Sequence, residues 1–292
     1  MFLFVVLFLV GASFCFALEE DNSSNGSTDS IEMASNAKSA IMIEASTGKI
    51  LYEKNKDEKL PMASMTKMMT LLLIMEEIDA GRLKWDEMIT TSEHAASMGG
   101  SQIFLEVGEK MSVEDLVKGI CIASGNDASV AMAERIGGTE EKFVVLMNKK
   151  AEKLGLSNTH FENACGLDSD NHYSSANDMS VIARELVKHK KILEFSGIYE
   201  DYLRKNTEKS FWLVNTNRLI KTYDGMDGLK TGYTKEAGYC LTATAKRGDM
   251  RLIGVVMGEE TSSIRNEEMT KLLDYGFNLY NVSSLVTNKT KL

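Results

Sequence analysis

The chain has 292 residues, of which 43% are hydrophobic and 26% are charged, and its formal net charge is -9. This composition is typical of a globular protein that buries a sizeable core, and the acidic balance argues against binding to nucleic acid, because no basic surface would offset the phosphate repulsion. The cysteines and histidines form no CxxC pair and no HExxH motif, so we expect neither a metal nor another cofactor.

The N-terminus predicts export. Residues 1–17, MFLFVVLFLVGASFCFA, are almost wholly apolar and end in the small residue Ala17, as in a signal peptide cleaved at that point. No Lys or Arg precedes Lys38, and the stretch is close to the lower limit for a bilayer span, so an uncleaved membrane anchor is the alternative. Residues 18–31 are acidic and rich in Ser, Asn and Gly, which predicts a flexible tether.

The following residues predict helices between two sets of strands. Alternating apolar residues around a Ser-Thr-Gly turn indicate a hairpin over 39–55, and apolar residues at three- and four-residue steps indicate a helix over 64–80. The same criteria predict helices over 112–123, 128–136, 140–154, 177–189 and 264–280, and a second hairpin with strands over 239–245 and 252–257. This order predicts an α+β fold, in which the first and last strands share an antiparallel sheet flanked by helices. One domain then covers residues 32–280, followed by a polar tail over 281–292.

The first of three short motifs with candidate chemistry is Ser64-Met65-Thr66-Lys67, at the start of the predicted 64–80 helix. Residues three apart share a helix face, so Ser64 and Lys67 can meet. A serine hydroxyl becomes a nucleophile when a base takes its proton, and a lysine can be that base when burial or a second cation keeps it partly neutral. Alone the motif is weak, because a capping serine and a surface lysine have the same spacing.

The other two motifs are Ser124-Gly125-Asn126, between two predicted helices, and Lys230-Thr231-Gly232, before the second hairpin. In Ser124-Gly125-Asn126, a hydroxyl can pass a proton and an amide can hold a peptide carbonyl. On a strand edge, Lys230-Thr231-Gly232 can direct its lysine to the site, bind a carboxylate through its threonine and let a ligand approach the backbone at its glycine. Each alone is equally typical of an ordinary turn. Their combination indicates an acyl-transfer enzyme with Ser64 as its nucleophile.

Ser-x-x-Lys, Ser-x-Asn and Lys-Thr-Gly in this order resemble the signature of penicillin-recognising serine enzymes. The flanking sequences resemble, more closely, the D-alanyl-D-alanine carboxypeptidases, which are the low-molecular-weight penicillin-binding proteins. The matching pieces span about residues 38–280 and are SAIMIEASTGKILYEKN, PMASMTKMMT, IASGNDAS, HYSSANDM, MDGLKTGYTKEAGYCLTATA and RLIGVVMG. The resemblance implies a β-lactamase/transpeptidase-like fold with a helical subdomain. It also implies removal of the terminal D-alanine from peptidoglycan pentapeptide stems and covalent inhibition by β-lactam antibiotics.

The resemblance implies a catalytic role for five residues. Ser64 forms the acyl-enzyme, and Lys67 is its base. Ser124 relays protons and Asn126 holds the substrate backbone. Lys230 sets the local field and helps to keep Lys67 partly neutral.

The resemblance also implies how the substrate is bound. Thr231 binds the terminal carboxylate of D-alanine, and Arg265 matches a family arginine near the same pocket. The backbone amides of Ser64 and Tyr233 form the oxyanion hole. Gly232 lets the backbone lie close to the ligand.

Two other functions are weighed against this one. A class A β-lactamase shares the three motifs but needs a Glu-x-x-x-Asn loop between the second and third, and no glutamate between Asp127 and Leu229 has an asparagine four residues on. A catalytically silent penicillin-binding or sensory module is disfavoured because every catalytic position is filled. The twelve residues after Tyr280 cannot provide the β-rich domain and amphipathic membrane helix of longer family members. We therefore expect membrane contact only through an uncleaved N-terminus.

Overall fold

Six consecutive buried residues form strand β1 (Ser39–Glu44), near the start of the part of the chain that the computed structural model describes, residues 33–280. Both faces of this strand are covered: Ile41 and Ile43 belong to one hydrophobic core, and Ala40 and Met42 to another. Such a continuous buried run is typical of a central strand. The predicted signal peptide, tether and tail lie outside the described residues.

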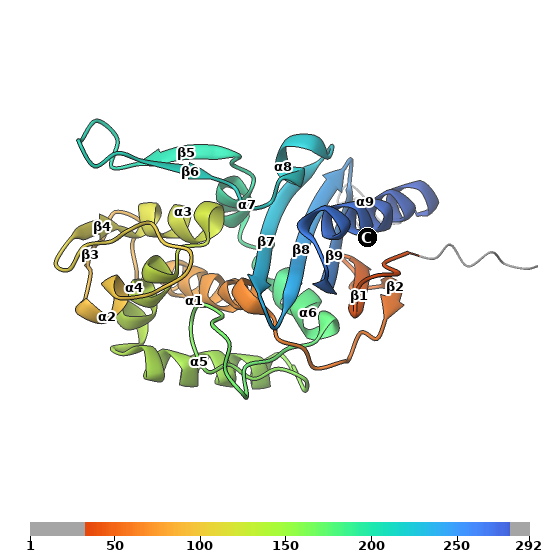
Figure 1. The fold of residues 1–292 in the computed structure, drawn as a ribbon, viewed down its shortest axis with the longest axis horizontal. Coiled ribbons are helices and arrows are strands. Elements are labelled where there is room, and N and C mark those ends of the chain that lie inside the picture. Colours follow the sequence, from red (N-terminus) through yellow and green to blue (C-terminus); the bar gives the residue numbers. More distant parts are fainter. Residues whose placement is uncertain (1–32, 281–292) are drawn as a thin grey trace, which may run out of the picture. The chain divides into compact units, whose positions relative to one another are not determined.

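Strand β1 joins the two ends of this region in one antiparallel sheet (Figure 1). It pairs with β2 (Ile50–Lys54) on one side and with β9 (Met250–Glu259) on the other, where Ile41 lies opposite Val255. The strand order is β2-β1-β9-β8-β7, with β8 at Gly238–Arg247 and β7 at Met226–Thr234. The predicted pairing of the first and last strands is therefore confirmed, and β7 forms one edge of the sheet.

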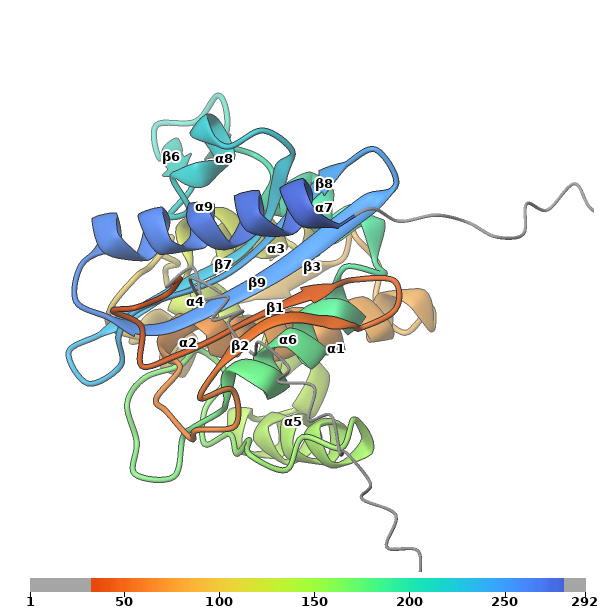
Figure 2. The same cartoon turned by 90° about the vertical axis from the view of Figure 1, so that its right-hand side faces the viewer.

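Helices cover both faces of the sheet (Figure 2). Helix α9 (Ser262–Leu279) packs on one face, where Met269, Leu272 and Leu273 share a core with the β-strands. Helices α6 (Ala176–Leu186) and α1 (Lys67–Asp79) lie on the other face. The sheet is thus the middle layer of a three-layer α+β fold, as predicted.

A helical subdomain surrounds the far end of α1 (Figure 1). Hydroxyl groups begin several of its helices; Ser112, for example, is an N-cap whose hydroxyl accepts a hydrogen bond from the amide of Asp115 at 3.1 Å. The helices of this region are α2 (Glu93–Ala96), α3 (Val113–Ala123), α4 (Asn126–Gly137) and α5 (Glu140–Lys153). No helix within residues 33–280 is both long enough and apolar enough to cross a bilayer.

Several short elements were not predicted, because their apolar runs are too short to give a clear period. Two of them form a hairpin, β5 (Glu200–Leu203) with β6 (Phe211–Val214), that projects beyond α3 (Figure 1). The others include β3 (Met88–Thr90) paired with β4 (Lys110–Ser112), and the short helices α2, α7 (Lys190–Ser196) and α8 (Leu219–Thr222).

Two predicted helix bounds are wrong in a way that concerns the site. The predicted 64–80 helix begins as a short 3-10 helix, η1 (Ala63–Thr66), and becomes α-helical only at Lys67. Helix α4 begins at Asn126 instead of residue 128, because Ser124 ends α3 in the left-handed conformation (φ 64°) and the chain turns directly into the next helix. Both serines therefore lie in tight turns.

Candidate active site

Ser64 lies in the 3-10 turn that precedes α1. In a 3-10 helix, residues three apart are eclipsed, so the side chain of Lys67 lies directly beside that of Ser64. The distance between Lys67 Nζ and Ser64 Oγ is 2.9 Å. The structure thus brings the first predicted pair into hydrogen-bonding contact.

The ammonium or amine of Lys67 is completely buried and has two further partners. Its Nζ lies 2.6 Å from Asn126 Oδ1 and 2.6 Å from the carbonyl oxygen of Cys165. Burial lowers the pKa of Lys67 to about 8, because desolvation disfavours its charged form. A neutral amine has two N–H groups, which suit the two carbonyl oxygens, and its lone pair then remains for the hydroxyl proton of Ser64.

Asn126 links this lysine to the loop opposite. Its Nδ2 donates to the carbonyl oxygen of Gly99 at 2.6 Å, and its backbone amide donates to that of Ser101 at 2.7 Å. The neighbouring carboxylate of Asp127 accepts the amides of Ile103 and Leu105 at 3.0 to 3.1 Å. The second motif therefore holds in place the loop that carries Ser101.

The third motif lies on edge strand β7, which runs past the 3-10 turn. A Cβ at Gly232 would lie 2.8 Å from the Met62 carbonyl oxygen and 3.2 Å from the Ser64 amide nitrogen, so only glycine permits this approach. Thr231 donates to the hydroxyl of Thr216 at 2.7 Å. Lys230 is buried, and burial together with the charge of Lys67 holds its pKa well below the usual range.

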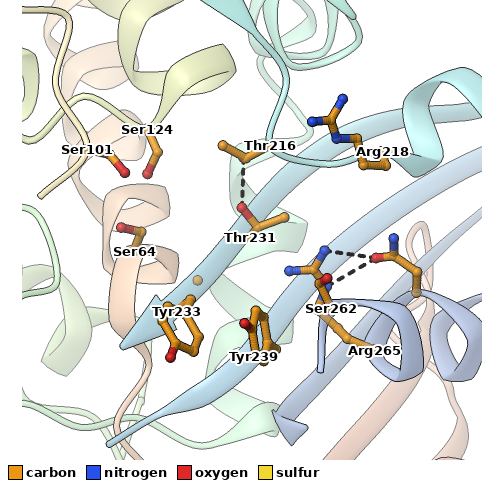
Figure 3. A pocket seen from close by; sticks show the side chains of 12 residues that line it. Ser64, Ser101, Ser124, Thr216, Arg218, Thr231, Tyr233, Tyr239, Ser262 and Arg265 are labelled. Atoms are coloured by element: carbon orange, nitrogen blue, oxygen red, sulfur yellow. Dashed lines mark hydrogen bonds between the residues drawn. The ribbon is translucent and has the colours of Figure 1, made fainter. Parts of the chain in front are cut away.

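These elements surround a cavity of about 370 Å³ (Figure 3). Side chains from all three motifs reach it, with Ser64 and Ser124 on one side and Thr231 on the other. Lys67, Asn126 and Lys230 lie buried behind this lining. The lining consists of Ser64, Ser101, Ser124, Thr216, Arg218, Thr231, Gly232, Tyr233, Tyr239, Ser262, Arg265 and Asn266.

Arg265 reaches the same cavity from the first turn of α9 (Figure 3). It is only 4% exposed, and burial lowers its pKa. Its Nε and Nη2 donate to Asn266 Oδ1 at 3.1 and 2.9 Å. A buried guanidinium at a polar cavity is a suitable partner for a carboxylate.

Two residues that help to position Ser64 and Lys67 could not be recognised in the sequence, because they act through their backbone. One is Cys165, whose carbonyl oxygen accepts from Lys67. The other is Gly166, whose φ is +92° and which faces Ala63, the residue before Ser64; Ala63 itself has a φ of +46°. A Cβ at Gly166 would lie 2.0 Å from the Ala63 carbonyl oxygen and 2.9 Å from the Ser64 amide nitrogen. The loop around Gly166 therefore supports the turn that presents Ser64.

Gly166→Ala is expected to slow acylation by a β-lactam by at least about 10-fold, since a shift of roughly 1 Å in a reacting group has a large effect on rate. Gly155→Ala is the matched control, because Gly155 also has positive φ (+72°) but has nothing within 4 Å of its Cβ position. Both variants carry the conformational cost of about 1 kcal/mol, and only Gly166→Ala displaces the Ser64 turn. Thermal denaturation and the rate of labelling by a fluorescent penicillin measure the two effects. Equal labelling rates for the two variants would contradict the supporting role of this loop.

Comparison with known proteins places this site in a family. The D-alanyl-D-alanine carboxypeptidase model of peptidase family S11 matches residues 25–261. The carboxypeptidase DacF of Bacillus subtilis (strain 168) is 62% identical over 254 residues, which cover 87% of this chain and 65% of that protein. The chain thus matches somewhat less than two thirds of the length of this relative.

Solved structures agree with the family match. The carboxypeptidase DacD from Francisella tularensis superposes with a TM-score of 0.79 at 35% identity, covering 90% of this chain and 78% of that one. Penicillin-binding protein D2 from Listeria monocytogenes, in its ampicillin-bound form, gives a TM-score of 0.74 at 34% identity and covers 83% of this chain and 98% of that one. The fold is therefore the β-lactamase/transpeptidase-like fold, and the chain belongs to the D-alanyl-D-alanine carboxypeptidase family of serine peptidases.

Proposed function

We propose that the protein is a serine-type D-alanyl-D-alanine carboxypeptidase, which removes the terminal D-alanine from peptidoglycan pentapeptide stems. The observation that carries the proposal is the contact between Ser64 Oγ and a buried Lys67 Nζ at 2.9 Å, in a cavity that also contains Thr231 and Arg265. A nucleophile with its base, beside carboxylate-binding groups, suits a peptide with a free C-terminus.

In the first step, Ser64 Oγ attacks the carbonyl carbon between the two D-alanines while its proton passes to neutral Lys67. In this scheme the oxyanion that forms is bound by the amides of Ser64 and Tyr233; the close approach of Gly232, the residue before Tyr233, to the Ser64 amide nitrogen supports this arrangement. The C–N bond then breaks. The leaving amine of D-alanine takes a proton through Ser124, whose side chain points into the same cavity.

In the second step, a water molecule attacks the Ser64 ester, and its proton returns through Lys67. The C–O bond to Ser64 breaks, which releases the shortened stem and restores the hydroxyl. Asn126 holds the substrate backbone through its amide, and Lys230 adds positive charge near the reacting oxygen when protonated and disfavours a charged Lys67. No metal or other cofactor takes part in this scheme.

The carboxylate of the terminal D-alanine binds to Thr231 and Arg265. Arg265→Ala is expected to lower kcat/KM for a D-alanyl-D-alanine peptide by about 10- to 100-fold, because a hydrogen bond to a charged group contributes roughly 1.5 to 3 kcal/mol. The same substitution should have much less effect on a peptide whose C-terminus is an amide. Kinetics on this pair of peptides separates carboxylate binding from folding. An equal loss on both peptides would show that Arg265 does not bind the carboxylate.

We further propose an extracytoplasmic place of action, since the peptidoglycan substrate lies outside the cytoplasmic membrane. In this scheme residues 1–17 are the signal peptide, 18–31 the tether, 32–280 the catalytic domain and 281–292 a polar tail. The protein is then secreted, or is held at the membrane by an uncleaved N-terminus. The predicted absence of nucleic-acid binding follows from the net charge of -9.

Intact-protein mass spectrometry after brief exposure to benzylpenicillin tests the proposal, together with release of D-alanine from a pentapeptide. We expect one stable penicillin adduct and release of one D-alanine per peptide. Destruction of the drug without an adduct would indicate a β-lactamase. An intact drug without an adduct would indicate a silent module.

A further inference from the structure

His172 is a buried histidine that the proposed mechanism does not use. It is only 4% exposed and lies in the segment that connects α5 to α6. Burial lowers the pKa of His172 to about 4, because desolvation disfavours the imidazolium, so the ring is neutral at pH 7. A neutral imidazole has one N–H donor and one acceptor nitrogen, and it can therefore connect two partners in a defined direction.

Both ring nitrogens of His172 have a partner, and one partner fixes the tautomer. The backbone amide of Glu162 donates to Nδ1 at 2.9 Å, so Nδ1 is the acceptor and the ring proton is on Nε2. Nε2 lies 2.7 Å from Thr66 Oγ1, to which it therefore donates. The ring of Phe161 packs edge to face against the imidazole, with 6.0 Å between the ring centroids. The hydrogen bonds thus run from Glu162 through His172 to Thr66.

Thr66 connects the imidazole to the turn that presents the nucleophile. Its side chain is completely buried, and its hydroxyl donates to the carbonyl oxygen of Ala63 at 2.8 Å. Ala63 has a φ of +46°, a conformation that alanine keeps only where surrounding contacts hold it. Because the N–H of His172 occupies a lone pair of the hydroxyl, the single hydroxyl proton is directed at this carbonyl. The contact between His172 and Thr66 therefore supports the strained turn before Ser64.

The other partner of His172 lies in the loop that contacts the base. Glu162 is three residues before Cys165, whose carbonyl oxygen accepts a hydrogen bond from the proposed base at 2.6 Å. Asn163 closes this loop, since its Oδ1 accepts the backbone amides of residues 165–167 at 2.6 to 3.2 Å. A hydrogen bond that fixes the amide of Glu162 therefore also fixes the loop that ends at the Cys165 carbonyl.

Backbone pairing keeps the segment 172–174 in place between the turn and the loop. Tyr173 exchanges two backbone hydrogen bonds with His160, at 2.9 and 3.1 Å, on the side of the loop. Ser174 exchanges two with Leu60, at 2.8 and 3.0 Å, and Leu60 belongs to the chain that leads into the 3-10 turn. The imidazole therefore extends from a fixed backbone and is itself rigid, so it holds its two partners at a fixed separation.

We propose that His172 is a positioning residue, which keeps Ser64 Oγ within reach of Lys67 Nζ. It does so by connecting the 3-10 turn of Ser64 to the loop of Cys165. This inference rests on the proposed function, in which Ser64 is the nucleophile. Within residues 33–280, His172 does not line the cavity, so it acts through Thr66 and the backbone and not by contact with the substrate.

The test compares His172→Ala with His172→Gln in single-turnover acylation by a fluorescent penicillin. His172→Ala removes both hydrogen bonds, and the rate constant of acylation should fall by at least about 10-fold, since a small displacement of a reacting group has a large effect on rate. A glutamine amide has an acceptor oxygen and N–H donors that can replace Nδ1 and the Nε2–H group, so His172→Gln should stay within about threefold of the wild type. The dissociation constant of the non-covalent penicillin complex should not change.

His160→Ala is the matched control, because His160 belongs to the same connecting segment but its ring packs on Tyr173. It should acylate at the wild-type rate. A purely structural role of His172 predicts a different result, since partial unfolding lowers the fraction of protein that is labelled and not the rate constant of the folded fraction. A lower labelled fraction with an unchanged rate constant would overturn the inference, and so would a His172→Gln variant as slow as His172→Ala.

Thr66→Val tests the connection from its other end. This variant should acylate about as slowly as His172→Ala, and the double variant should be no slower than either, because both substitutions break the same connection. Losses that add in the double variant would show that the two residues act separately, which contradicts the inference.

A measurement on His172 itself does not depend on catalysis. NMR of ¹⁵N-labelled protein at pH 7 should show a neutral ring with its proton on Nε2, in slow exchange with water, and Thr66→Val should shift the signal of this proton. These results would support the connection even if the wild-type protein were not acylated, which would refute the proposed function alone. A ring proton on Nδ1, or fast exchange of the Nε2 proton, contradicts the inference.

Discussion

Ser64→Ala is expected to abolish the benzylpenicillin adduct and to lower kcat/KM for a D-alanyl-D-alanine peptide by at least about 10³-fold, as in other enzymes that lose a nucleophilic serine. No other hydroxyl can replace it at the same point. Among the described residues, Ser64 has the only hydroxyl that contacts Lys67 Nζ, at 2.9 Å. The amide nitrogen of Ser64 lies beside Gly232. Mass spectrometry and D-alanine release measure the two losses.

Ser97→Ala is the matched control, because Ser97 is an exposed serine whose hydroxyl donates to the carbonyl oxygen of His94. It should acylate at the wild-type rate. Both variants should unfold at nearly the wild-type temperature, since neither removes a large buried side chain. Adduct formation by folded Ser64→Ala protein would exclude Ser64 as the nucleophile.

The second prediction with a large effect is that the acylation rate depends on pH through Lys67. The base must be neutral to accept the proton of Ser64, and the pKa of Lys67 is lowered to about 8. The neutral fraction, and with it the acylation rate, should therefore rise with pH through about 8 and increase about 10-fold between pH 7 and pH 9. Stopped-flow measurement of acylation by a fluorescent penicillin gives this profile.

Lys67→Ala should reduce the acylation rate by at least about 10²-fold, since general-base catalysis contributes roughly 10² to 10⁴. The remaining rate should lose the rise near pH 8. Lys149→Ala, a lysine of helix α5, serves as the control and should keep the wild-type profile. An acylation rate that falls as the pH increases through 8 would show that charged Lys67, and not neutral Lys67, is the active form.

The fold class could be predicted because strong local patterns and three motifs in a fixed order agree. The pairing of β1 with β9 followed from the order of strands and helices, and the meeting of Ser64 with Lys67 followed from their spacing. The β5–β6 hairpin could not be predicted from its short strands. Its position depends on buried contacts of Leu203 and Leu213 and on the anchoring of Asn215, which are tertiary interactions.

The active site, like the fold, could be predicted only in part from the sequence. Ser64, Ser124 and Thr231 could be named because each belongs to a motif. Other side chains that line the cavity, among them Ser101 and Thr216, belong to no motif and could not be named. The carbonyl of Cys165 and the glycine beside it could not, since their contribution is made by the backbone, about a hundred residues from Lys67 in sequence. The strained turn at Ala63 was also missed, because alanine rarely adopts a positive φ and nothing in its side chain indicates it.

The sheet order β2-β1-β9-β8-β7 has a consequence for the folding of the chain during its synthesis. The inner strand β1 is made first, but its partner β9 is made almost last, after β7 has supplied Thr231. Contacts between such distant segments have a large loop-closure entropy and form slowly. A growing chain therefore contains Ser64 for most of its synthesis before β7, β8 and β9 are present, and the proposed activity should appear only when all five strands have paired.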